Sequence, residues 1–176
     1  MVADLSELED FAATAAANIA RFEVRFVLSP ELMSKDPFCI ESLEWDHIPY
    51  GHDQLEKVPD DSRGVYAFCI CQESQVLPCH RYVMYVGIAG HDSDRSIRAR
   101  YRDYLNAKKL MKRSARVRRL FGEWHSMLHF YFAPVGNEVS SEQLKKIEKE
   151  LNGALLPPMS KADLEADIKQ QRDAFQ

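Results

Sequence analysis

The sequence lacks any apolar run approaching the roughly 20 residues that a membrane-spanning helix needs, so we expect no membrane as a partner. We also expect no export signal, because the first residues, MVADLSELEDF, are acidic and contain no basic segment. Only four cysteines are present (Cys39, Cys69, Cys71 and Cys79), and without an export signal they are expected to be reduced thiols. These absences predict a cytoplasmic location.

The chain also has no internal repeat and no low-complexity tract. With 45% apolar and 28% charged residues among 176, its composition is typical of one folded domain with a modest extension. We predict an N-terminal extension over residues 1–60, a main domain over residues 61–160, and a C-terminal helix over residues 161–176 that packs on it.

The net charge of −4 argues at first against a nucleic-acid partner, but the charge is unevenly distributed. Residues 95–119 contain eleven bases and one acid, so this segment carries +10 and the rest of the chain −14. Such a basic stripe indicates phosphate binding. The alternative is a solvated helix face, although such faces usually mix signs because like charges at i,i+4 cost about 0.2–0.5 kcal/mol per pair. The candidate DNA contacts are Arg95, Arg98, Arg102, Lys108, Lys109, Lys112, Arg113 and Arg116.

The first third of the chain predicts a helix, a strand and connecting structure. Residues 3–20 are alanine-rich and carry acids early, as the start of a helix prefers. Phe22–Leu28 alternates apolar and polar residues and is predicted to be a strand. Ser29-Pro30-Glu31 can begin a short helical turn, and residues 35–62, with three prolines, are predicted to connect elements.

The next part predicts a small antiparallel sheet. Gly64–Gln72 and Arg81–Ile88 are rich in β-branched and aromatic residues, and the loop between them is polar, which is typical of a hairpin. His129–Val135 predicts a third strand. Between them, Asp94 is expected to cap one helix, SIRARYRDYLNA, and Ser114 another, ARVRRLF, that stops near Gly122.

Two more helices complete the predicted order. Ser140 and Gln143 fit a capping box that opens a helix to about Leu155, where Pro157-Pro158 ends it. A final helix, LEADIKQQRDAF, closes the chain. The order β-β-α-α-β-α-α predicts an α+β fold with a three-stranded antiparallel sheet flanked by helices, plus an N-terminal helical and strand extension.

Two tripeptides on the hairpin, Gly64-Val65-Tyr66 and Tyr85-Val86-Gly87, resemble the two halves of the motif that names the GIY-YIG nuclease family. The second half continues with Ile88-Ala89, as is usual in that family. The helix that follows is also similar, because Arg100 precedes Tyr104 by four residues and both share one helix face. This family includes homing endonucleases, some restriction enzymes and the incision subunit of bacterial nucleotide-excision repair.

The resemblance continues to the end of the main domain. The segment IEKELNGALLPPMS is similar to the family's closing helix and places Glu148 at the position of its glutamate. Glu148 is preferred to its neighbour Glu150, the fallback, because apolar residues flank it at core-like spacing. The match runs from about Arg63 to Ser160 and includes the structural positions Gly64, Gly87 and Ser160.

This resemblance implies a DNA endonuclease that uses Mg²⁺, or Mn²⁺ in its place. Glu148 would bind the metal, since Mg²⁺ keeps most of its waters and typically takes only one or two carboxylates. Arg100 would hold the scissile phosphate as a bidentate cation. Tyr66 would accept the proton of the attacking water, which requires nearby positive charge because a free tyrosine has a pKa of about 10. Tyr85 and Tyr104 would orient the water or the phosphate.

Two departures from the family stand out. The loop between Tyr66 and Tyr85 has 18 residues and is longer than usual, which lengthens the hairpin without necessarily moving the tyrosines. Ser160 stands where the family commonly has asparagine. Serine can keep a helix-capping role, but it would contact substrate or a tyrosine more weakly.

Several structural interpretations compete with these roles. For Tyr66 and Tyr85, each taken singly, the interpretation as half-buried strand tyrosines is favoured. The spacing of Cys69, Cys71, Cys79 and His80 differs from that of usual zinc ligands, and core packing is favoured for the first two. His125 and His129 lack the glutamate of a zinc-protease helix. For Trp124 and Tyr101, core packing is favoured over stacking on bases.

Three functional alternatives remain beside the nuclease. One is a catalytically silent module of the same fold that binds nucleic acid or another protein. Another is an interaction role for the N-terminal helix. A third is RNA as substrate, because a site that grips phosphate does not itself distinguish the sugars. One active site must act twice, or in a homodimer, to break both strands, so a homodimer is a further hypothesis.

Overall fold

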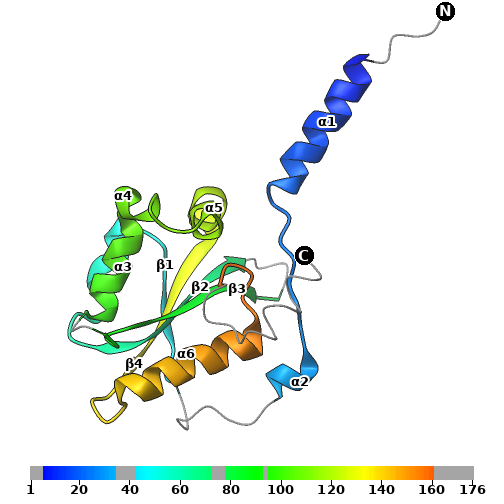
Figure 1. Cartoon of the computed structure of the whole chain (residues 1–176). Coiled ribbons are helices and arrows are strands. Elements are labelled where there is room, and N and C mark those ends of the chain that lie inside the picture. The colour runs from blue at the N-terminus through cyan, green and yellow to red at the C-terminus, as the bar shows by residue number, and fades with distance from the viewer. Residues whose placement is uncertain (1–5, 35–42, 73–77, 93–94, 161–176) are drawn as a thin grey trace, which may run out of the picture.

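The computed structural model describes residues 6–34, 43–72, 78–92 and 95–160, and the sheet at its centre has four antiparallel strands (Figure 1). They are β1 (Asp46–Pro49), β2 (Arg63–Gln72), β3 (His80–Ala89) and β4 (Leu128–Val135), in the order β1-β4-β2-β3. The central pair is β4 and β2, and β3 lies at one edge. The fold class is therefore α+β.

The helices cover both faces of this sheet (Figure 1). Their bounds are α1 Ser6–Ala20, α2 Pro30–Met33, α3 Ile97–Leu105, α4 Ala107–Leu110, α5 Ala115–Trp124 and α6 Ser141–Leu155, with 3₁₀ helices η1 His52–Lys57 and η2 His125–Met127. In the described part of the chain, no helix is long and apolar enough to cross a membrane.

The prediction of three strands was wrong, because β1 adds a fourth within residues 35–62, which were predicted to be connecting structure. β1 pairs with β4, with Ile48 opposite Phe130. It has four residues, of which only Ile48 is buried, and it ends in Pro49. Such a short segment shows no alternation, and a proline is tolerated there because β1 is an edge strand.

The predicted strand over Phe22–Leu28 is also absent. These residues form no sheet ladder; Val24 packs against the core and the ring of Phe26 lies 5.4 Å from that of Tyr82 on β3. The edge of β3 is instead hydrogen-bonded by the chain after α6, where Met159 N donates to Met84 O at 2.9 Å. Part of the β3 edge is therefore already hydrogen-bonded and is not open to pairing with a further strand.

Helix starts follow the capping residues with one correction. α3 begins after Ser96, whose Oγ accepts from Ala99 N, and not after Asp94, which lies outside the described residues. Ser114 caps α5 and the Ser140–Gln143 capping box opens α6, as predicted. α5 continues to Trp124, two residues past Gly122. The predicted final helix lies outside the described residues.

The sheet separates two cores. On one face, Tyr66, Phe68 and Phe130 pack against residues of α3 and α5, and Tyr101 and Trp124 lie in this core as favoured from the sequence. On the other face, strand residues including Cys69 and Cys71 pack with Leu144, Ile147 and Leu151 of α6. Burial of both cysteines in an apolar core agrees with the packing role predicted for them.

α1 stands apart from both cores. None of its residues is buried, and Figure 1 shows it projecting away from the sheet. Its alanine content therefore supports the helix through intrinsic propensity, with no burial against the domain.

Candidate active site

The two tyrosines of the hairpin motif lie on the same face of the sheet. Tyr66 is opposite Gly87, and Phe68 is opposite Tyr85. A Cβ atom at Gly87 would lie 2.5 Å from the Tyr66 hydroxyl and 2.6 Å from its Cζ, well inside contact distance. The ring of Tyr66 therefore crosses β3 at a position that only glycine leaves open.

A register shift in the hairpin turns Tyr85 toward this face. Phe68 pairs with Tyr85 but Cys69 pairs with Val83, so Met84 is an extra residue on β3. Val83 and Tyr85 would share a face in a regular strand, yet Val83 packs in the α6 core and Tyr85 in the other. Bulges of this kind commonly re-aim a side chain beside an active site.

Helix α3 brings the third tyrosine. The Tyr104 hydroxyl lies 3.0 Å from the Tyr66 hydroxyl, at hydrogen-bond distance. The ring centroids of Tyr66, Tyr85 and Tyr104 form a triangle with sides of 5.9, 6.2 and 6.3 Å. The guanidinium of Arg113, just before α5, lies 5.1 Å from the centroid of the Tyr104 ring, a cation–π distance. We call Tyr66, Tyr85, Tyr104 and Arg100 the tyrosine–arginine cluster.

Arg100 is the cation of this cluster. Burial disfavours its charge, but Tyr66, Tyr104 and Tyr85 together raise its pKa, so it remains protonated. Its Nε is buried and has no hydrogen-bond partner among the described residues. An orphaned buried donor on a cation is costly, and an anionic acceptor such as a phosphate oxygen would satisfy it.

Tyr66 is neutral in this environment. Complete burial raises its pKa well above the ordinary value, Tyr104 and Tyr85 raise it further, and Arg100 lowers it. Additional positive charge beside the hydroxyl is therefore required before Tyr66 can accept a proton near neutral pH.

Glu148 comes from α6, which covers the opposite face of the sheet from Tyr66. It is partly exposed between the buried residues Ile147 and Leu151, and its carbonyl accepts from the buried Asn152 amide at 2.9 Å. The fallback residue Glu150 lies 3.7 Å from Lys146 in an i,i+4 ion pair. The structure thus brings four of the five predicted catalytic residues together and places Glu148 on a separate element.

Gly64 and Ser160 support the packing of the chain within and beside the sheet. A Cβ atom at Gly64 would lie 2.2 Å from the carbonyl oxygen of Ala133, so this glycine permits the close pairing of β2 and β4. Ser160 is 1% exposed, and its Oγ accepts from Val86 N at 3.2 Å. The serine thereby holds the chain after α6 against β3, next to Tyr85.

The predicted DNA-contact residues fall into two groups. In the first, Arg98 contacts Val58 O and Glu56, while Arg95 and Lys109 both pair with the buried carboxylate of Asp103, so these cations support the fold. The second group comprises exposed or partly exposed residues: Arg102, Lys108, Lys112, Arg113 and Arg116. Sequence alone could not separate the groups, because the partners of Arg98 lie about forty residues away and the three-residue contact around Asp103 forms only in the folded chain.

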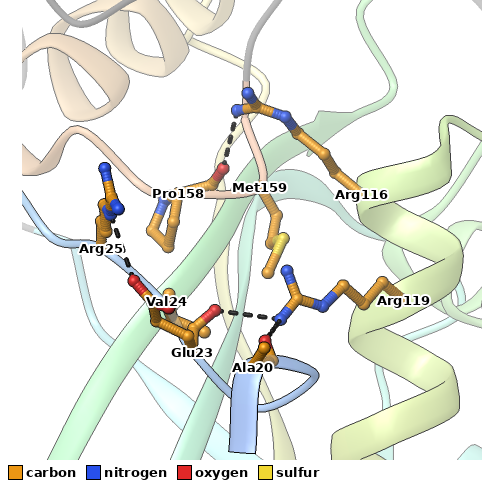
Figure 2. A pocket seen from close by; sticks show the side chains of 8 residues that line it. All are labelled: Ala20, Glu23, Val24, Arg25, Arg116, Arg119, Pro158 and Met159. Carbon is orange, nitrogen blue, oxygen red and sulfur yellow. Dashed lines mark hydrogen bonds and ion pairs between the residues drawn. The ribbon is translucent and has the colours of Figure 1, made fainter. Parts of the chain in front are cut away.

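Sequence reasoning missed Arg119 as a site residue. Its guanidinium donates to the carbonyls of Ala20, Arg21 and Glu23, where α1 ends. Arg119, Ala20 and Glu23 line a pocket of about 290 Å³, together with Arg25, Arg116, Val24, Pro158 and Met159 (Figure 2). The only signal for this pocket was the unusual arginine density of residues 113–119.

No family model, curated protein or solved structure matches this chain. The resemblance to GIY-YIG nucleases therefore remains a prediction from the sequence motifs.

Proposed function

We propose that this chain is a GIY-YIG-type endonuclease that hydrolyses DNA phosphodiester bonds with one divalent metal. The observation that carries the proposal is the convergence of Tyr66, Tyr85, Tyr104 and Arg100, from both halves of the hairpin and from α3. Three hydroxyl groups around one cation can bind a phosphate and a water together. Such pre-arranged polar groups act by stabilising charge in the transition state.

The residues present fit Mg²⁺ better than a metal that needs several protein ligands. Among the described residues, no group of three histidine, cysteine or carboxylate side chains is placed to hold a metal. A single half-exposed carboxylate, Glu148, suits Mg²⁺, which is usually held by one or two carboxylates and several waters. The chemistry that Mg²⁺ or Mn²⁺ would supply is neutralisation of phosphate charge and help for the leaving oxygen.

The protein's own groups supply the remaining steps. Arg100 binds the scissile phosphate through its guanidinium group, and Tyr85 positions the phosphate or the attacking water. Tyr66 accepts the proton of that water as a phenolate, which forms by prior loss of its own proton to solvent and is stabilised by the hydrogen bond from the Tyr104 hydroxyl, and it thereby becomes a neutral phenol again. The exposed cations Arg102, Lys108 and Lys112 hold the DNA backbone without reading its sequence.

The test is plasmid cleavage by the purified full chain with Mg²⁺ or Mn²⁺, with EDTA as control. Arg100→Ala and Glu148→Gln should abolish metal-dependent nicking while the circular dichroism spectrum is retained. Glu142→Gln is the matched control for Glu148, because Glu142 is an exposed carboxylate in the first turn of the same helix. Glu150→Gln tests the fallback ligand.

A second candidate function is a silent nucleic-acid-binding module. It is favoured by the raised pKa of Tyr66, which leaves the proposed base protonated. This candidate predicts salt-sensitive DNA binding with no cleavage of duplex DNA, single-stranded DNA or RNA at any metal concentration. Cleavage of RNA in preference to DNA would instead identify an RNA-directed nuclease of the same design.

A further inference from the structure

We propose that the pocket between α5 and the end of α1 binds one nucleotide of the substrate strand, beside the tyrosine–arginine cluster. This inference rests on the proposed nuclease function. The pocket is lined by Ala20, Glu23, Val24, Arg25, Arg116, Arg119, Pro158 and Met159 (Figure 2). Residues 20–25 form one wall, so the N-terminal extension takes part in the site.

The charge of the pocket favours an anion. Three arginines line it against one acid, Glu23, which leaves a net +2. Glu23 is itself paired with Arg25 at 3.2 Å. Guanidinium groups bind phosphate oxygens with directed, charge-assisted hydrogen bonds. Arg119 also keeps its Nη1 without a hydrogen-bond partner among the described residues, while its Nε and Nη2 hold the carbonyls at the end of α1.

The size and walls of the pocket favour more than a phosphate. Its volume of about 290 Å³ lies near the lower end of small-molecule sites, roughly 300–1,000 Å³. Val24, Pro158 and Met159 offer apolar surface between the arginines, and Figure 2 shows the Met159 side chain directed toward Arg119. An apolar wall with cations beside it suits a nucleotide, whose base or sugar contacts the wall while its phosphate meets the arginines.

The pocket is connected to the tyrosine–arginine cluster in two ways. Met159 N donates to the carbonyl of Met84, the residue before Tyr85. Arg116, which donates to Pro158 O at 3.1 Å, lies three residues after Arg113, and Arg113 covers the ring of Tyr104. The segments that line the pocket therefore also contact the elements that carry the tyrosine–arginine cluster.

The experiment uses the full chain labelled with [methyl-¹³C]methionine, in EDTA so that no cleavage occurs. The Met159 methyl signal, assigned with the Met159→Leu variant, reports the pocket, and the exposed Met111 and Met127 serve as internal references. Thymidine 5′-monophosphate is titrated, with thymidine and inorganic phosphate in separate arms. We expect a saturable shift of the Met159 signal with the nucleotide, at lower concentrations than with either part.

Substitutions distinguish binding in the pocket from nonspecific attraction of the nucleotide to basic residues. Arg116→Ala should weaken nucleotide binding by about tenfold or more, since it removes a charge-assisted hydrogen bond. Val24→Phe, which fills the apolar wall, should weaken it without changing charge. Arg118→Ala is the matched control, because Arg118 is exposed on the same helix and does not line the pocket. Arg119→Ala is unsuitable as a test, because it would remove the hydrogen bonds that hold residues 20–23, one wall of the pocket, against α5.

Three results would overturn the nucleotide site: an unmoved Met159 signal, equal losses in Arg116→Ala and Arg118→Ala, or equally tight binding of inorganic phosphate alone. The plasmid assay on the unmodified chain separates the two proposals. Cleavage with an unresponsive Met159 signal would leave the nuclease and remove the pocket. A responsive Met159 signal without cleavage would leave a nucleotide site and remove the nuclease.

Discussion

Gly87 is the residue on which the geometry of the tyrosine–arginine cluster depends most directly. In Gly87→Ala, the new methyl group would overlap the Tyr66 ring, whose hydroxyl lies 2.5 Å from the Cβ position. Because Tyr66 is buried, its ring can yield only by straining the core, and overpacking typically costs about 1–3 kcal/mol. We expect this loss in urea denaturation and a fall in cleavage of about 10²-fold or more from misplacement of the ring.

Gly122 of α5 provides a control for this prediction. A Cβ atom at Gly122 meets nothing within 4 Å, and alanine is the better helix former there by about 1 kcal/mol. Gly122→Ala should therefore be neutral or stabilising and leave cleavage unchanged. If Gly87→Ala behaved like Gly122→Ala in both assays, the ring would not occupy the position on which the proposed mechanism relies.

Cys69 predicts how stability depends on alkaline pH. Burial raises the pKa of its thiol from 9.0 to about 12, with Cys71 raising it further and Arg81 lowering it. A folded-state pKa above the unfolded one stabilises the protein fully below pH 9 and loses this stabilisation as pH rises toward 12. At about 1.4 kcal/mol per unit, some 2–3 kcal/mol should be lost between pH 9 and 11.

The measurement is the free energy of unfolding in urea at pH 8, 9, 10 and 11 for the unmodified chain and Cys69→Ala. The variant should start lower, because it leaves a cavity, but should decline less steeply across this window. The pKa of Tyr101 is likewise raised, to about 12, mainly by burial, so some decline should persist in the variant. Parallel declines would show that Cys69 ionises as easily in the folded protein as in the unfolded one.

Among the elements, strand β3 depends on the chain that follows α6. Ser160→Ala removes the acceptor for Val86 N, and an unsatisfied buried donor costs about 1–3 kcal/mol. We expect that loss in thermal or urea unfolding, together with reduced cleavage because Val86 adjoins Tyr85. Ser126→Ala, at an exposed position in η2, should stay within about 0.5 kcal/mol. Equal effects of the two variants would mean that Ser160 does not hold this edge.

The elements also show what the sequence could and could not predict. The hairpin and α6 were predictable because β-branched residues, alternation and the Ser140–Gln143 capping box all agree locally. The bulge at Met84 was not, because it is a matter of register between two strands and leaves no pattern within either. β1 was missed because four residues ending in a proline carry too little periodicity, and its place is set by pairing with β4.

The candidate site, too, has features that the sequence could predict and features that it could not. The shared helix face of Arg100 and Tyr104 could be predicted from their i,i+4 spacing, whereas the direction of Tyr85 could not, because it depends on the register shift at Met84. The different uses of the basic residues could not. The partners of Arg98 are η1 residues about forty positions away, so the contact exists only once the chain has folded.

At the scale of the whole molecule, the structure predicts where the chain can be shortened. Removing residues 1–28 deletes α1 and the pocket wall, including the partly buried Val24, but leaves the buried residues of both cores and all four strands. Removing residues 1–58 also deletes β1, the fully buried Val58, and Tyr50, whose hydroxyl donates to Tyr104 O at 2.8 Å. Losing a buried apolar side chain costs about 2–5 kcal/mol, so the second deletion should consume most of a typical stability of 5–15 kcal/mol.

Scanning calorimetry and plasmid cleavage on both shortened chains test this prediction. The chain that begins at residue 29 should melt cooperatively and retain metal-dependent nicking. It should also bind DNA more weakly, with a shallower salt dependence, since it lacks Arg21 and Arg25. The chain that begins at residue 59 should show no cooperative transition. A cooperative transition there at an unchanged temperature would mean that residues 1–60 are a separable extension and that β1 contributes little to the core around Tyr104.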